Sequence, residues 1–396
     1  MKKILFMAIA AICVVAGCKK NPVPVPEDDS PVAVQFSTRT IDASVTRTKA
    51  AVDDWTGTEE LHIFGFAAKR SGGNYVDGSQ VTLGSGRYNL AAPFIDGNPE
   101  NGVKADSPST GTNGTINVYN PDADTNTEPF YYDVNTNVVY DFYGYYFGNA
   151  TVENNNVHGA AAIDVITYPV TINGTQDLLY ATTDKATDVE GAAETVTTSQ
   201  AYGAWAARRG VQPTLNFKHA LSQFKFEVKR GRGSFNKKLT IQSIQILGSN
   251  KGKFTVVGST LGYVQIEDTN MNDSFTLQGK SSGTDISFTE ESTDYTKVDG
   301  LLMIAPNQDK ITVKVTMHAE NYTPNSGIIE STFELPATKV SLGGANVTKF
   351  EEGKSYTVKM VVYGPEQVEF EVSLAEWTNG GTIEYDPDNN NNGPAA

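Results

Sequence analysis

The sequence has 396 residues, a formal net charge of −15 at pH 7 and two cysteines, Cys13 and Cys18. The acidic balance argues against nucleic acid or anionic lipid as partners attracted by long-range charge, and the scattered histidines give no metal-ligand spacing. Only Cys18 remains once the leader is removed. The stability of the two domains that the length predicts must therefore come from packed cores, without a disulfide.

Residues 1–17 are predicted to be an export signal. Lys2 and Lys3 give a positive start, and residues 4–15 form an apolar stretch of about a dozen residues. As a helix that stretch would be about 18 Å long at about 1.5 Å per residue, short of the roughly 30 Å hydrocarbon core of a bilayer. The segment is therefore interpreted as a targeting signal and not as a membrane span.

The leader ends in VAGC at residues 15–18, which resembles a lipobox. This resemblance implies that the thiol of Cys18 carries a diacylglycerol that anchors the mature chain. A signal peptide with a chance cysteine at its end is the alternative. Residues 18–31 then form a tether, because their prolines stiffen it and their acidic side chains keep it solvated.

Beyond the tether, apolar and polar residues alternate in the pattern of half-buried β-strands. The clearest alternating runs are residues 32–36, 224–228, 311–315 and 368–374, and another β-branched run spans 241–246. Amphipathic helices are hard to find, and residues 183–209 would form one or two short turns. Loops are expected where Gly, Asn, Thr and Asp gather, at 97–128 and 279–296, either as surface decoration or as binding segments.

This pattern predicts an all-β chain of two antiparallel β-sandwich domains in series. The boundary is placed near residues 210–213, between a loose Ala- and Thr-rich stretch and denser, more regular strands. The expected domains are residues 32–210, whose first strand lies within 32–45, and residues 211–385, followed by a flexible tail at 386–396.

Motifs for catalysis or metal binding are incomplete. Residues 279–283, GKSSG, have the letters of a nucleophile elbow, but that motif needs a helix after its serine and a polar loop follows here. Residues 388–393, DNNNNG, match the first half of a calcium loop, without the glutamate expected at its twelfth position. A weaker calcium candidate at 122–133 has Thr127 in place of the turn glycine. The sequence therefore predicts no enzyme, no cofactor and no metal site.

An aromatic cluster at residues 130–132 and 140–147 allows two interpretations. Tyr131 and Tyr132 could form an exposed platform for a sugar, whereas tyrosine also fills sandwich cores with its hydroxyl at the edge. The alternation at residues 143–147 favours a core strand.

Five segments, in order along the chain, resemble the fimbrillin family, the type V pilins that are exported as lipoproteins. They are residues 34–66 (with VQFS, TRT, WTG and LHIFGF), 177–181 (DLLYA), 215–222 (LNFKHALS), 302–308 (LMIAPNQ), and 350–356 together with 372–377. Their order and spacing cover almost the whole mature chain, although no single segment is specific. The resemblance implies transthyretin-like β-sandwiches and a location on the outer membrane surface or in a fimbrium.

The resemblance also implies a route of assembly. In type V pilins an arginine-specific protease removes the lipidated first strand, and a strand of another subunit fills the apolar groove that this leaves. The matching bonds here are Arg47–Thr48, which is preferred because it follows the whole segment 32–45, and Arg39–Thr40. The alternative is that both arginines are simply exposed residues.

The expected function is a structural or adhesive pilus subunit that is not an enzyme. Its expected partners are other pilin subunits, the protease, outer-membrane lipid through Cys18, and a host or bacterial surface receptor that the sequence does not identify. The alternative is a monomeric surface lipoprotein that binds glycan or a host ligand. The tail from Asp386 lacks alternating apolar residues, which favours an accessory or tip position over the main shaft.

Overall fold

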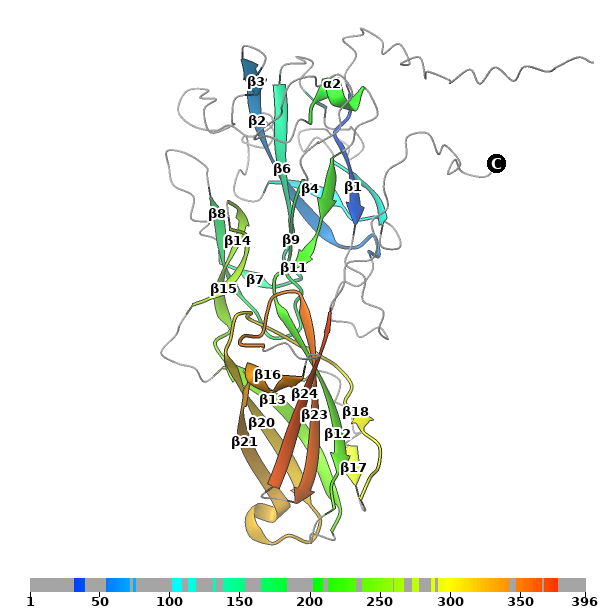
Figure 1. Cartoon of the computed structure of the whole chain (residues 1–396), viewed down its shortest axis with the longest axis vertical. Helices are drawn as coiled ribbons and strands as arrows, with labels where there is room; N and C mark the ends of the chain where they lie inside the picture. The colour runs from blue at the N-terminus through cyan, green and yellow to red at the C-terminus, as the bar shows by residue number, and fades with distance from the viewer. Residues whose placement is uncertain are drawn as a thin grey trace, which may run out of the picture.

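The computed structural model describes residues 32–39, 55–71, 74–75, 102–108, 113–118, 131–132, 138–153, 165–183, 202–208, 213–232, 237–258, 260–266, 273–277, 286–288, 291–341, 347–364 and 367–376. These residues form an elongated, nearly all-β molecule (Figure 1). Its described helical segments are α2 (Ala204–Ala207) and the 3-10 turns η2 (Pro324–Gly327) and η3 (Ala337–Lys339). None of them has the length and apolarity that crossing a membrane requires.

Two sheets form the upper half of the molecule in Figure 1. The smaller has the order β10 (Thr214–Asn216), β1 (Gln35–Arg39), β5 (Asn113–Asn117). The larger has the order β11 (Lys218–His219), β9 (Leu179–Thr182), β6 (Val138–Tyr146), β2 (Glu60–Ser71), β3 (Asn74–Tyr75), and β4 (Val103–Asp106) also pairs with β2.

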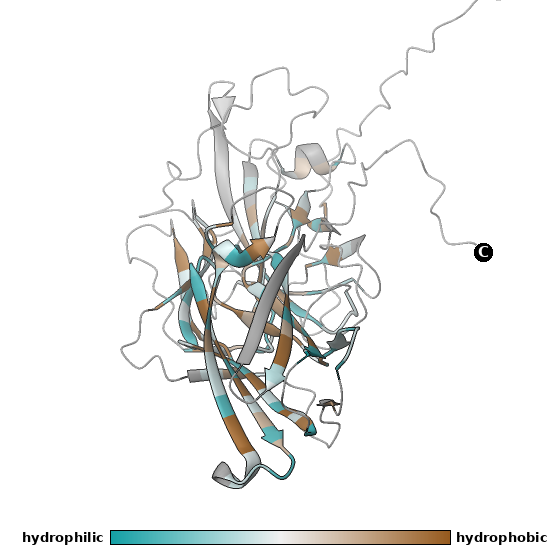
Figure 2. Cartoon of the chain, turned by 60° about the horizontal axis from the view of Figure 1, so that its bottom comes forward, coloured by the Kyte–Doolittle hydropathy of each residue, from teal (hydrophilic) through white to brown (hydrophobic). Residues whose placement is uncertain are grey.

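Two further sheets form the lower half as the layers of a sandwich (Figure 1). One has the order β18 (Thr296–Lys297), β12 (Ser222–Arg230), β23 (Lys354–Gly364), β24 (Gln367–Glu376), β22 (Val340–Ser341), with β19 (Leu302–Ile304) also on β12. The other has the order β16 (Asp273–Thr276), β13 (Leu239–Gly248), β20 (Lys310–Ala319), β21 (Ile328–Pro336), with β17 (Ile286–Phe288) also on β13. Apolar and polar residues alternate along these strands (Figure 2), so the apolar ones fill the space between the layers.

A small fifth sheet links segments from both sides of the boundary predicted at residues 210–213. Its order is β15 (Gly262–Gln265), β14 (Lys251–Val257), β8 (Ile166–Thr171), β7 (Thr151–Val152). Strands β10 and β11 lie after the predicted boundary and pair with β1 and β9 before it. Strand pairs of the described chain therefore join residues before the boundary to residues after it. The division at this point stays a prediction.

The predicted all-β fold of antiparallel sandwiches is confirmed, although three of the strand pairs that the structure describes run parallel. The pairs β1–β10, β12–β23 and β22–β24 are parallel. Two parallel neighbours need a long connection between them. The strands β12 and β23, for example, lie far apart in the sequence, so the chain between them is long enough to connect them. Local alternation in a sequence does not indicate such pairs, because it reports the face of a strand and not its neighbour.

Within the described part of the chain, the buried apolar residues form two clusters. The upper cluster gathers residues that lie between positions 34 and 217 of the chain, and its members are Val34, Phe36, Trp55, Leu61, Ile63, Val103, Ala105, Ile116, Val118, Tyr132, Tyr140, Phe142, Leu179, Ala181, Tyr202, Ala204, Leu215 and Phe217. The lower cluster fills the sandwich and extends under the small fifth sheet to reach Phe64 and Tyr145. The two clusters are called by these names below.

Candidate functional site

Strand β1 occupies the centre of its sheet. It pairs in parallel with β10, where Ser37 lies opposite Thr214, and antiparallel with β5, where Phe36 lies opposite Ile116. Backbone N–H and C=O groups on both sides of the strand are therefore used. Removing β1 would leave two unpaired sheet edges facing one another, which is the arrangement that accepts a new strand.

Val34, just before β1, and Phe36 of β1 belong to the upper cluster. Val34 is 1% exposed and Phe36 is fully buried. The ring of Phe36 meets that of Phe142 edge to face, with their centroids 4.7 Å apart. The amide of Gln35 donates to Oδ1 of Asn117 at 3.1 Å on the opposite face. The period of two read from residues 32–36 is thus the alternation of core and surface side chains.

The described chain resumes after β1 at a tightly held turn. Trp55 is 1% exposed and meets Phe217 edge to face at 5.2 Å. The next turn contains Gly57 at φ +77°, a backbone conformation that favours glycine. The carboxylate of Glu59 caps this turn, because it accepts hydrogen bonds from the backbone N–H and the hydroxyl of Thr56. The WTG segment therefore fixes the point at which the chain enters β2.

The electrostatics of Glu59 follow from this capping role. Ser107 also donates its hydroxyl to the Glu59 carboxylate. Burial alone would raise the pKa of Glu59, but the hydrogen bonds from Ser107 and Thr56 outweigh it and lower the pKa below its usual value. The carboxylate is thus held in its charged form, as a cap for orphan donors.

A buried pair joins the second and third resemblance segments. Nδ1 of His219 lies 2.8 Å from Oδ1 of Asp177, and the two side chains are 0% and 1% exposed. Gly148, at φ +58°, packs against Asp177 so closely that an added Cβ would lie 2.2 Å from the Asp177 carbonyl oxygen. These contacts lie where β9 and β11 pair, just before the chain passes into β12 of the sandwich.

The fourth and fifth resemblance segments meet the third at the same level of the molecule. The Ser222 hydroxyl donates to the carbonyl of Glu351 at 2.7 Å, and the Asn307 N–H donates to the carbonyl of Phe350 at 2.6 Å. Gly353 donates to Leu221 at 2.9 Å. Segments that are far apart in the sequence therefore converge where the upper and lower halves join.

The residues predicted as sites fall into two groups. Cys18, Thr40 and the Arg47–Thr48 bond lie outside the described residues. Arg39 is the last residue of β1, and its backbone lies opposite Asn113 on β5 and Asn216 on β10. The elbow letters at 279–283 and the calcium-like runs at 122–126 and 388–393 also lie outside. Among the residues that the structure describes, no group of His, Cys, Asp and Glu is arranged to hold a metal ion.

The aromatic platform is not formed as a pair of exposed rings. Tyr132 is 3% exposed and belongs to the upper cluster, whereas Tyr131 is 41% exposed. Burial raises the pKa of Tyr132 well above its usual range. Tyr140 and Tyr145 are buried too, so the interpretation of this region as core strand is the better one.

Comparison with known proteins shows the family to which the chain belongs. The sequence model of the fimbrillin-like family matches residues 46–377, and no curated protein matches the sequence. Similar solved structures include a candidate cell adhesion protein from Bacteroides uniformis, 14% identical with a TM-score of 0.45 over 87% of this chain and 98% of that one. A fimbrial protein from Bacteroides vulgatus is 12% identical with a TM-score of 0.43 over 87% and 99%. The tip fimbrial protein Mfa3 from Porphyromonas gingivalis, truncated at its C-terminus, is 9% identical with a TM-score of 0.31 over 88% and 100%. Because the family model spans most of its length, this chain belongs to the fimbrillin-like family.

Proposed function

We propose that this chain is a structural or adhesive subunit of a cell-surface pilus that assembles by strand exchange. Membership of the fimbrillin-like family supports a surface role in a fimbrium or in adhesion, and a structural one rather than catalysis. The observation that carries the finer proposal is the position of β1, a central strand supplied by the segment before both candidate cleavage bonds.

The geometry of β1 favours Arg47–Thr48 over Arg39–Thr40 as the cleaved bond. A protease binds its substrate as an extended strand and pairs with its backbone. Arg39 already lies between Asn113 and Asn216 on the two neighbouring strands, so its backbone is not free for a protease. A cut after Arg47 would release the whole of β1, while Trp55 would keep the remaining chain fixed to Phe217.

Loss of β1 would open a groove with two kinds of unsatisfied surface. The facing edges of β5 and β10 would lose their hydrogen-bond partners, and the side chains that now contact β1, including Ile116 and Phe142, would face water. A strand from another subunit would restore both, provided that it carries apolar residues two positions apart, as Val34 and Phe36 do. Cleavage would therefore act as the trigger for assembly.

The proposal also covers how the precursor is exported and which position the subunit takes in the pilus. The precursor would reach the outer membrane surface as a lipoprotein anchored through Cys18, and cleavage would release that anchor together with β1. The alternating segment at the C-terminal end forms β24, which pairs with β23 of its own sandwich from Lys354–Glu376 to Gly364–Gln367. Because that segment is already paired, we favour an accessory or tip position over the main shaft.

N-terminal sequencing of pilus material sheared from cells tests this proposal. The mature subunit is expected to begin at Thr48, and Arg47→Ala is expected to leave a chain that begins at Cys18 and does not polymerise. Arg39→Ala is the matched control and should be processed like the natural chain. A start at Cys18 in sheared polymers of the natural chain, or a start at Thr40, would contradict cleavage at Arg47.

A further inference from the structure

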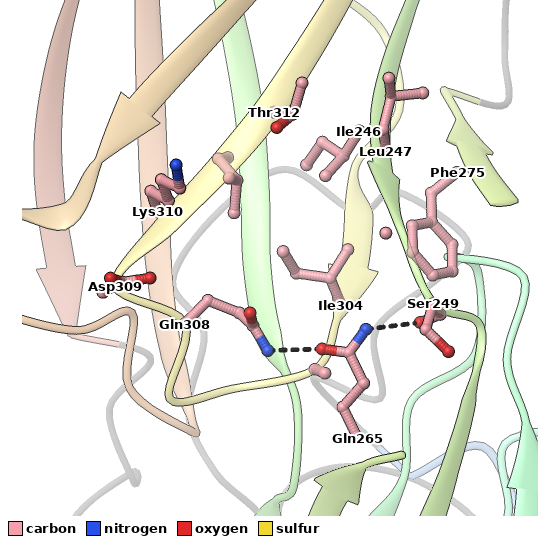
Figure 3. Close-up of a pocket in the computed structure, with 13 residues that line it drawn as sticks. Ile246, Leu247, Ser249, Gln265, Phe275, Ile304, Gln308, Asp309, Lys310 and Thr312 are labelled. Carbon is pink, nitrogen blue, oxygen red and sulfur yellow. Dashed lines mark hydrogen bonds between the residues drawn. The ribbon is translucent and has the colours of Figure 1, made fainter. Parts of the chain in front are cut away.

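A cavity of about 160 Å³ opens at the upper end of the sandwich (Figure 3). It is lined by the end of β13 and the residue after it (246–249), by Gln265 of β15, by Phe275 of β16, and by residues 304–305 and 308–312 at the end of β19 and the start of β20. One water needs roughly 10–15 Å³ of such space, so the cavity has room for roughly ten waters, or for one small ring with its substituents.

Two carboxamides stand along one side of the cavity. Nε2 of Gln308 donates to Oε1 of Gln265 at 2.6 Å, and Nε2 of Gln265 donates to the carbonyl oxygen of Ser249 at 3.0 Å. Each carboxamide has two N–H donors and an acceptor oxygen with two lone pairs. One N–H of each amide and Oε1 of Gln308 thus have no partner in the described part of the chain, and they remain available to a ligand.

The opposite side of the cavity is apolar. Figure 3 shows the ring of Phe275 and the side chains of Ile246 and Ile304 across from the two carboxamides. These three residues are buried, at 3%, 1% and 4% exposure. A ligand that satisfies both sides must have hydroxyls or amides on one face and C–H groups on the other.

The segment that carries Gln308 is held in place before any ligand arrives. Asn307 has φ +66°, and its N–H donates to the Phe350 carbonyl at 2.6 Å. The N–H of Phe350 returns a bond to the Gln308 carbonyl at 2.8 Å, and Ala337 donates to the carbonyl of Asp309 at 2.8 Å. Because the backbone is fixed on both sides of Gln308, binding costs little ordering of the site.

The charged residues at the rim of the cavity limit the charge that a ligand can carry. Asp309 is exposed beside the cavity, and a carboxylate accepts hydrogen bonds without donating any. The ammonium of neighbouring Lys310 lies 2.7 Å from Glu334, which offsets its charge. The rim is therefore acidic, like the chain as a whole, and it disfavours anionic ligands.

We propose that this cavity binds a single neutral sugar ring. Sugar hydroxyls both donate and accept hydrogen bonds, so they match the free N–H groups of Gln265 and Gln308 and the carboxylate of Asp309. The C–H face of the ring would then pack against Phe275 and Ile304. Strand β1 contributes no residue to the cavity, so this proposal stands apart from strand exchange and applies to cut and uncut chains alike.

Titration of the full chain with single sugars tests the proposal by calorimetry and by saturation-transfer NMR. The probes are galactose, glucose, mannose, fucose, their N-acetylhexosamine relatives, and N-acetylneuraminic acid as the anionic comparison. At least one neutral sugar should bind saturably in the millimolar range, and N-acetylneuraminic acid more weakly. Absence of saturable binding by every neutral sugar, or preference for the anionic one, would overturn the proposal.

Three variants locate the binding. Gln308→Leu keeps the size of the side chain and should weaken binding about tenfold, because it removes an amide that faces the sugar. Asp309→Asn, at an exposed position that does not threaten folding, should weaken it severalfold. Gln245→Leu is the matched control, since Gln245 bonds to Thr276 on the other face of β13, and it should bind like the natural chain. Binding that survives both cavity variants would place the sugar elsewhere.

Discussion

The upper and lower clusters differ in where their central strands come from. The inner strands of the sandwich in the described part of the chain, β12, β13, β20, β23 and β24, all lie between Ser222 and Glu376. The upper cluster instead takes a central strand, β1, from a segment that precedes Arg47. The two layers of the sandwich are thus built from one continuous stretch of chain, whereas the upper cluster depends on a strand from the segment before Arg47.

This difference would let the stability of the sandwich and the proposed strand exchange depend on different halves of the molecule. Loss of β1 removes no residue from the sandwich, because the lower cluster contains none of its side chains. It removes Val34 and Phe36 from the upper cluster, where both are buried. A protein built in this way can keep one half folded while the other half changes its partner strand.

Matched core truncations should show the largest effect. Phe36→Ala is expected to destabilise the uncut chain by about 3–5 kcal/mol and to speed amide exchange in β5 and β10. Phe226→Ala, in the sandwich core, should cost about the same but speed exchange in β12 and β23. Urea unfolding and hydrogen exchange measured on both variants check this. Equal loosening of both halves by Phe36→Ala would show that the two cores are not separate.

Breaking the buried pair at the junction should come next in size. Asp177→Ala leaves the buried His219 imidazole without its 2.8 Å partner and is expected to cost about 3–5 kcal/mol at most, as other buried pairs do. His219→Ala is the matching variant. The double variant should cost less than the sum of the two, because both single changes remove the same interaction. Strict additivity in urea unfolding would contradict a coupled pair.

The capped turn at Glu59 predicts a pH dependence of stability that originates in the upper half. Since the pKa of Glu59 is lowered in the folded chain, its contribution is present above the unfolded pKa of about 4.3 and is lost as pH falls through the folded value. Glu59→Gln should therefore be less stable than the natural chain at pH 7, and the gap should shrink toward pH 3. Urea midpoints at both pH values check this, and a constant gap would refute it.

Alternation in the sequence located strands and their faces well. Residues 224–228, 311–315 and 368–374 lie within β12, β20 and β24. The run at 241–246 is more instructive, because Ile241 and Ile244 are three positions apart and both are fully buried. A register shift between Ile241 and Ser243 in the β13–β20 pair explains this, since a bulge adds one residue to the period.

Pairing between distant segments could not be read from the sequence in the same way. The parallel pair β1–β10 brings Ser37 next to Thr214, and the small fifth sheet joins β8 to β14. The bond between Asp177 and His219 and the cavity beside Gln308 arise from such pairings. Each depends on the tertiary arrangement of strands, which a local period does not contain. The structure shows that several of the resemblance segments meet at the junction of the two halves, which the sequence did not predict.

The smallest expected effect on stability comes from exposed ion pairs, which both halves contain. Lys104 lies 2.9 Å from Glu60 in the upper half, and Lys314 lies 2.9 Å from Glu330 in the lower half, as ion pairs with exposed partners. Lys104→Ala and Lys314→Ala should each cost less than about 1 kcal/mol, because water and salt screen such pairs. The small losses should fade further in high salt, measured as shifts of the urea midpoint. A large loss in the upper half alone would mean that charged residues on its surface, and not only β1 in its core, hold that half together.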